Sequence, residues 1–231
     1  MQTLHGRWAL VTGASRGIGK QVAQALAAEG CKLILHSRTL EHTDALAATL
    51  RSQGTITHQL AAELSDSGAV QNLATEVSAL CNTLDVLFNN AAVMTPYHDN
   101  YLDVVPSEYA LSFQVNTLAP ILLCNHFLPA MTEQKWGRIV NVTSGIKDQP
   151  ELMAYAASKA ALDKYVYDMA PKLTGTGVTM NLLDPGWLRT DLGGPNAPGS
   201  VESVLPGALV SVLAQDGVSG QLVCAQNFAR V

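Results

Sequence analysis

The stretch that decides the fold of this 231-residue chain reads Thr12-Gly13-Ala14-Ser15-Arg16-Gly17-Ile18-Gly19. It joins an apolar run that ends at residue 12 to an amphipathic segment, as a turn between a strand and a helix does. Glycines at this spacing let the backbone turn tightly and approach a pyrophosphate, while amides at the helix start point toward its charge. The stretch therefore predicts a dinucleotide-binding turn, with contributions from Gly13, Ser15, Arg16, Gly17, Ile18 and Gly19.

Apolar runs and amphipathic segments alternate along the rest of the chain. Strands are expected at residues 8–12, 32–36, 55–60, 85–89, 138–142 and 178–183. Helices are expected at residues 17–29, 40–53, 66–80, 106–134 and 153–173. Continuously apolar strands separated by helices predict an α/β fold, a doubly wound Rossmann-type parallel sheet with helices on both faces. No linker interrupts the alternation, so residues 1–231 are expected to form a single domain.

Residues 184–200 form the one irregular stretch, with four glycines and three prolines. So many residues that break helices and strands predict a loop. Because ligands of such sheets bind at the carboxyl ends of the strands, this loop would cover the site as a lid next to the substrate. The alternative is an inert connector, although loops of this length usually have a function.

The overall composition narrows the range of partners. The net charge is -5 and Lys and Arg form no cluster, which argues against a nucleic-acid surface. The sequence shows no signal peptide, no membrane-spanning run and no basic amphipathic segment, so a cytoplasmic protein is expected. Four scattered cysteines without a Cys-x-x-Cys pair are expected to be reduced and buried, and no metal site is expected.

The end of the second expected strand selects between dinucleotides. An acidic side chain there accepts from the adenosine ribose, whereas an arginine accommodates a 2′-phosphate. This chain has Ser37-Arg38 and no acid, and Arg16 lies in the glycine turn. Two guanidinium groups favour NADP over NAD. The alternative is that both arginines are solvated surface residues.

Two further segments are weaker candidates for the cofactor site. Glu63-Leu64, after the third expected strand, places a carboxylate where it could accept from an adenine amino group, although a plain surface acid is an equal alternative. Asn90 lies in the run Asn89-Asn90-Ala91-Ala92, whose small residues allow the backbone to pass close to a ribose. Asparagine is also common in ordinary turns.

Tyr155 and Lys159 are the first candidates for chemistry. Residues four apart share one face of a helix, so the phenol and the ammonium can address one reacting centre. A nearby cation favours phenolate, so Lys159 is expected to lower the pKa of Tyr155 and make it a usable proton donor. Ser144 ends the fifth expected strand, where its hydroxyl can donate to a substrate oxygen. Asn116 is disfavoured in mid-helix, where a bend could direct a carbonyl and an amide toward the site.

Together these motifs resemble the short-chain dehydrogenase/reductase family over nearly the whole chain. Residues 12–19 look like its cofactor motif, and residues 89–92 look like its Asn-Asn-Ala-Gly motif with an alanine at the last position. Residues 185–190 look like the Pro-Gly motif that seats the nicotinamide carboxamide, which adds Leu188 and Thr190 to the cofactor contacts. The catalytic tetrad that the resemblance implies is Asn116, Ser144, Tyr155 and Lys159.

The resemblance implies an NADP-dependent oxidoreductase of the carbonyl-reductase type, which transfers a hydride between the nicotinamide and a carbonyl or alcohol substrate. In that mechanism Tyr155 gives a proton to the carbonyl oxygen and Ser144 polarises that oxygen. Lys159 also binds the nicotinamide ribose, and Asn116 orders the water that resupplies the proton.

Three matters stay open at this point. The fold could serve a cofactor-binding regulator or scaffold without useful turnover, or a lyase or epimerase with a transient hydride transfer. The substrate is not readable from the sequence. Family members often pair through two long helices, here around residues 109–130 and 155–173, so a homodimer or homotetramer is expected.

Overall fold

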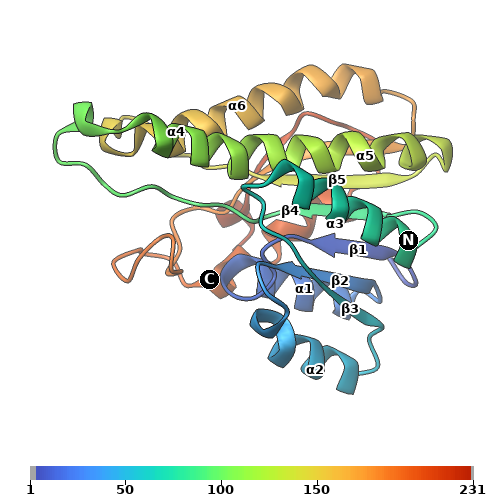
Figure 1. Cartoon of the computed structure of the whole chain (residues 1–231). Helices are drawn as coiled ribbons and strands as arrows, with labels where there is room; N and C mark the ends of the chain where they lie inside the picture. The colour runs from blue at the N-terminus through green and yellow to red at the C-terminus, as the bar shows by residue number, and fades with distance from the viewer. Residues whose placement is uncertain (1–3, 230–231) are drawn as a thin grey trace.

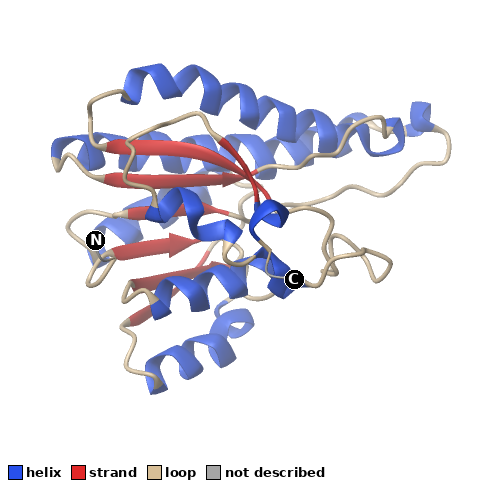
Figure 2. Cartoon of the chain, turned by 180° about the vertical axis from the view of Figure 1, so that it is seen from behind, coloured by secondary structure: helices blue, strands red, loops and turns tan. Residues whose placement is uncertain are grey.

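The computed structural model describes residues 4–229, which form a seven-stranded sheet with helices on both faces (Figures 1 and 2). The strand order is β3-β2-β1-β4-β5-β6-β7, and every neighbouring pair is parallel. The expected Rossmann-type α/β fold is therefore confirmed. The strands are β1 (Trp8–Val11), β2 (Lys32–Ser37), β3 (Thr57–Ala61), β4 (Val86–Asn89), β5 (Gly137–Val142), β6 (Val178–Asp184) and β7 (Leu222–Cys224).

The helices cover both faces because alternate strand residues point to opposite layers. In the centre of the sheet, Val11 and Leu35 pack in the core beneath α1 and α2. Leu10 and Ile34 pack in the other core, beneath α3 and α5. Both faces are buried, which is why these strands are apolar throughout. The α-helices are α1 (Gly17–Ala28), α2 (Asp44–Ser52), α3 (Ser67–Leu80), α4 (Pro106–Phe113), α5 (Ala119–Glu133), α6 (Met153–Met169) and α7 (Val210–Leu213).

Two features differ from the expectation drawn from the sequence. The sheet has one strand more than the six that were expected. This strand, β7, pairs with β6 at the sheet edge and is too short to show a periodic pattern. The helix expected at residues 106–134 is interrupted by a π-helical turn at Gln114–Leu118. Pro120 explains the interruption, because it has no N–H to donate to the Asn116 carbonyl four residues earlier.

The topology places a cleft at the carboxyl ends of the strands. After β3 at one edge the chain returns to β4 on the other side of β1, so the connections diverge on the two sides of β1. The long loops gather at this end of the sheet (Figure 2). In the part of the chain that the structure describes, no helix has the length and apolar character needed to cross a membrane.

Candidate active site

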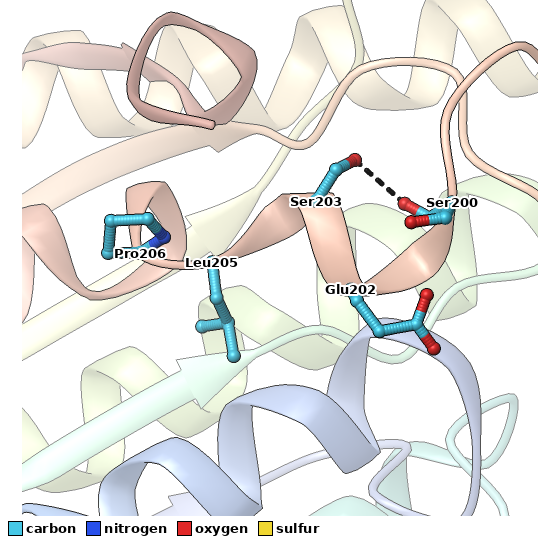
Figure 3. A pocket seen from close by; sticks show the side chains of 5 residues that line it. All are labelled: Ser200, Glu202, Ser203, Leu205 and Pro206. Carbon is cyan, nitrogen blue, oxygen red and sulfur yellow. Dashed lines mark hydrogen bonds between the residues drawn. The ribbon is translucent and has the colours of Figure 1, made fainter. Parts of the chain in front are cut away.

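A cleft of about 810 Å³ opens at the switch point between β1 and β4. The predicted site residues that line it are Gly13, Ser15, Arg16, Gly17, Ile18, Arg38, Glu63, Leu64, Asn90, Tyr155, Lys159 and Thr190. A second hollow of about 460 Å³ is lined by Ser200, Glu202, Ser203, Leu205 and Pro206 (Figure 3). That hollow contains one ionisable side chain and none of the predicted site residues, so the cleft is the candidate active site.

Four predicted site residues do not line the cleft, namely Gly19, Asn116, Ser144 and Leu188. Gly19 lies beneath the glycine turn, where a Cβ would come within 2.2 Å of the Gly13 carbonyl oxygen. The Leu188 side chain is buried in the hydrophobic core, so the structure does not bring it to the cofactor cleft. Asn116 and Ser144 each bond to a residue that does line the cleft, Asn116 to Val93 and Ser144 to Tyr155.

Buried side chains hold the glycine turn from two sides. The N–H of Gly13 donates to Nδ1 of His36 at 3.3 Å, and Nε2 of His36 lies 3.1 Å from the Ala62 carbonyl oxygen. This pairing assigns the ring proton to Nε2. On the other side, Nδ2 of Asn90 donates to the carbonyls of Thr12 at 2.9 Å and Gly13 at 3.1 Å. The turn is therefore fixed by the protein itself.

The sequence did not single out His36 as a site residue. Burial lowers the pKa of His36 to about 4, so the ring is neutral near pH 7 and can accept from Gly13. The available signal was a polar residue at the end of an apolar strand beside the expected phosphate turn. That signal does not reveal which atom the ring contacts, because the contact joins segments far apart in sequence.

The adenosine end of the cleft carries the two expected arginines. Arg16 and Arg38 are both exposed, and Nε of Arg16 forms an ion pair with Asp191 of the loop after β6 at 2.8 Å. The Ser37 hydroxyl donates to the Thr39 carbonyl at 2.6 Å. No carboxylate stands directly after β2, and both arginines line the cleft.

Tyr155 faces the cleft from the first turn of α6 and is only 5% exposed. Burial raises the pKa of its phenol; a hydrogen bond with Ser144 opposes this effect, and the charge of Asp184 adds to it. The Lys159 ammonium lies 5.8 Å from the centre of the Tyr155 ring. The expected lowering of the Tyr155 pKa by Lys159 is therefore wrong for this structure, because desolvation of the phenolate dominates. The phenol is protonated near neutral pH.

Lys159 lies one helical turn further along α6 and is 3% exposed. Its Nζ donates to the Val142 carbonyl at 2.8 Å. Burial lowers the pKa of Lys159 to about 8, and the negative charge of Asp163 opposes that shift. An ammonium has three N–H donors, so two remain for a ligand in the cleft.

Asn116 lies fully buried in the π-helical turn, where the expected bend is present. Its Oδ1 accepts from the N–H of Val93 at 2.9 Å, and its Nδ2 donates to the Val93 carbonyl at 2.9 Å. Nδ2 also lies 3.0 Å from the Ser158 hydroxyl, next to Lys159. The side chain thus fastens the segment after β4 to α6.

The loop from residue 185 to 200 packs against the glycine turn without regular structure. A Cβ at Gly17 would lie 3.4 Å from the Thr190 side chain, so the two segments are in contact. The Thr190 hydroxyl accepts from the N–H of Gly193 at 3.0 Å. Trp187 is 61% exposed, with its indole N–H donating to the Gly193 carbonyl at 2.7 Å.

The cysteines are free thiols in the described residues. Cys31, Cys81 and Cys124 are buried as expected, whereas Cys224 is only half-buried. Within residues 4–229, no group of three or more His, Cys, Asp or Glu side chains could hold a metal ion.

Comparison with known proteins identifies the family. A family model described as short chain dehydrogenase matches residues 7–199. The chain therefore belongs to the short-chain dehydrogenase/reductase family, as its motifs predicted. A solved metagenomic short-chain oxidoreductase in complex with NADP is 32% identical, with a TM-score of 0.82 over 96% of this chain and 99% of that chain.

Two curated relatives show how far the similarity extends. A short chain dehydrogenase of Pseudocercospora fijiensis is 33% identical over 197 residues, which is 84% of this chain and 63% of that protein. The human inactive hydroxysteroid dehydrogenase-like protein 1 is 30% identical over 194 residues, which is 83% of this chain and 59% of that protein. The chain thus spans less than two thirds of the length of either relative.

Proposed function

We propose that the protein is an NADPH-dependent carbonyl reductase, which acts in reverse as an alcohol dehydrogenase. The observation that carries the proposal is that Tyr155 and Lys159 line the same cleft as the glycine turn. A protonated phenol and a buried cation therefore stand beside a backbone shaped for a dinucleotide. The NADP complex of the metagenomic relative supports the choice of cofactor.

The residues present fit NADP at both ends of the cleft. A Cβ at Gly13 would meet Ala91 at 3.0 Å, and Gly17 has a φ of 55°, so these two positions of the turn have to stay free of side chains. At the adenosine end, Arg16 and Arg38 offer charge-assisted hydrogen bonds to a 2′-phosphate. Beside these, the residues that would hold the remainder of the cofactor are Ser15, Ile18, Glu63, Leu64, Asn90, Tyr155, Lys159, Thr190 and the backbone at Leu188.

In this mechanism the bound cofactor supplies the hydride. Tyr155, kept protonated by burial, gives its proton to the substrate oxygen. The Ser144 hydroxyl donates to the same oxygen and stabilises the negative charge that develops there. Lys159 offsets the charge left on Tyr155, and water at the Asn116 carbonyl returns the proton through Lys159.

The experiment that tests the proposal is a panel of ketones, aldehydes and quinones scored by NADPH oxidation. Wild-type protein is expected to consume NADPH with at least one of them, and the Tyr155→Phe variant is the matched control for background oxidation. A protein that binds NADPH but consumes none with any substrate would favour the regulator or scaffold instead. The intact constellation of Ser144, Tyr155 and Lys159 argues against that second function, although one relative carries the word inactive in its name.

Two structural roles belong to the same proposal. Residues 185–200 would act as a lid over the bound cofactor within one domain that comprises the whole chain. The helices α4, α5 and α6 would pair two copies of the chain, because Leu118, in the turn between α4 and α5, and Tyr167, on α6, leave apolar surface exposed. Light scattering of the purified protein tests this pairing, and a monomer at micromolar concentration would refute it.

A further inference from the structure

Asp163 is a half-buried acid on α6 that the proposed reaction leaves without a role. It follows Lys159 by four residues, so both side chains lie on the face that also carries Tyr155. Helical side chains lean toward the N-terminus, which directs the Asp163 carboxylate over the turn that contains Lys159. Within residues 4–229, no direct ion pair joins the two side chains, so the carboxylate acts on the ammonium through its charge and not through a hydrogen bond.

The surroundings of Asp163 are unusual for a surface acid. Its Oδ1 is fully buried and meets no donor in good hydrogen-bonding geometry, and the polar neighbour of the carboxylate is the Thr143 side chain, whose hydroxyl is also buried without a well-aligned partner. An unpaired buried carboxylate oxygen is costly to a fold unless a nearby charge compensates it. Burial raises the pKa of the Asp163 carboxyl, and the Thr143 side chain and the positive charge of Lys159 both oppose that rise. The Lys159 ammonium spends only one of its donors, on the Val142 carbonyl.

The charges around Lys159 come from two elements. From α6 the ammonium faces Tyr155 and Asp163, and from the end of β6 the Asp184 carboxylate acts on both of those side chains. Asp184 is already engaged, since its Oδ1 accepts from the N–H of Gly186 at 2.9 Å. Asp163 is thus the carboxylate whose free oxygen is left to balance the buried lysine.

We propose that Asp163 is a positioning residue that acts through Lys159, and that its carboxylate keeps the buried ammonium charged and available to the cleft. This role rests on the proposed function. Burial alone disfavours the ammonium, and the charge of Asp163 opposes that effect. Without the charge of Asp163, Lys159 would lose its proton at a lower pH, and the contact between the ammonium and the cofactor would be lost at that pH.

The first test compares Asp163→Asn with Asp168→Asn, an exposed acid on the same helix that pairs with Lys164. In Asp163→Asn, the pH at which NADPH affinity and turnover decline on the alkaline side is expected to fall by about one unit, the usual effect of an opposite charge. Asp163→Glu keeps the charge and is expected to follow the wild type, as is Asp168→Asn. A uniform loss at every pH, or an unchanged profile, would overturn the proposal.

The second test needs no turnover and uses the protein without cofactor. At pH 7, Asp163→Asn is expected to lower the Tm by about 3 °C or more, and by less than about 1 °C in the Lys159→Met background. Equal losses in the two backgrounds, or a double variant that fails to fold, would show that Asp163 does not act through Lys159. If wild-type protein shows no NADPH turnover while this coupling is present, the proposed function fails and the role of Asp163 stands.

Discussion

The glycine turn and the loop after β6 touch each other at the cleft, yet they are held in different ways. The turn is fixed by Thr12, His36 and Asn90, with the first two only 2% exposed. The loop is held near the turn by the Arg16–Asp191 ion pair, whose side chains are 60% and 71% exposed. Buried hydrogen bonds are costly to break, whereas exposed ion pairs contribute about 0–1 kcal/mol.

This difference separates two tasks. A cofactor is the same in every catalytic cycle, so its binding turn gains from a rigid backbone shaped in advance. The loop, in its proposed role as a lid, would have to open for exchange, and the exposed ion pair at Asp191 would let that part of it do so. Substitutions should therefore have large, specific effects on the rigid side of the cleft and small effects on the loop.

The largest expected effect is at Tyr155. Tyr155→Phe removes the proposed proton donor while keeping the ring, so turnover should fall by about 10²–10⁴-fold. NADPH affinity should change little, because the helix and Lys159 remain in place. Steady-state turnover and NADPH fluorescence titration check this, and a variant with more than about a tenth of wild-type activity would require another proton donor.

A smaller effect is expected at the adenosine end. Arg38→Ala should raise the KM for NADPH about tenfold and leave that for NADH within about twofold, because a charge-assisted hydrogen bond contributes about 1.5–3 kcal/mol. Kinetics with both cofactors on the wild type and the variant measure it. Arg51→Ala, on α2 and away from the lining of the cleft, serves as the control. A wild type that prefers NADH would contradict the NADP assignment.

A substitution of His36 tests the rigidity of the glycine turn without changing the proposed catalytic residues. His36→Leu removes the acceptor of the Gly13 N–H, so the KM for NADPH should rise about fivefold with kcat unchanged, since one neutral hydrogen bond contributes about 0.5–1.5 kcal/mol. His36→Asn keeps an acceptor near Nδ1 and should recover most of the affinity. A parallel loss of kcat in His36→Leu would mean that the ring supports more than the turn.

The same residue makes stability depend on pH. Burial lowers the pKa of His36 to about 4 in the folded state, below its ordinary value, so the folded protein resists protonation there. This contribution is present above the ordinary histidine pKa of about 6.5 and is lost as pH falls toward 4. The Tm of the wild type should therefore fall more steeply than the Tm of His36→Leu as pH is lowered over that window. Identical slopes of Tm against pH would contradict this assignment.

The smallest effect is expected in the loop. Asp191→Asn breaks an exposed ion pair, so kcat and the KM for NADPH should each change by less than about threefold. Raising the ionic strength should mimic the substitution in the wild type. A tenfold effect would mean that the loop is held as tightly as the glycine turn, and the contrast between the two regions would fail.

Most of the fold followed from local patterns, since strands buried on both faces and amphipathic helices leave a periodic trace. The start of α3 also rests on a local contact, because the Asp66 side chain accepts from backbone N–H groups two and three residues later. The edge strand β7 was missed, because three residues pairing with a distant strand leave no local pattern. The interruption at Asn116 was anticipated only as a bend, although Pro120 was a local signal that an i to i+4 hydrogen bond is missing there.

By itself the sequence determined the sheet, the glycine turn and the set of polar residues at the carboxyl ends of the strands, because each depends on residues close together in the chain. Only the tertiary structure decided how those residues act on one another. It turned the Leu188 side chain into the core, placed the His36 ring against the Gly13 N–H and buried the Tyr155 phenol so that its pKa is raised. These outcomes depend on desolvation and on contacts between distant segments, which no local pattern records.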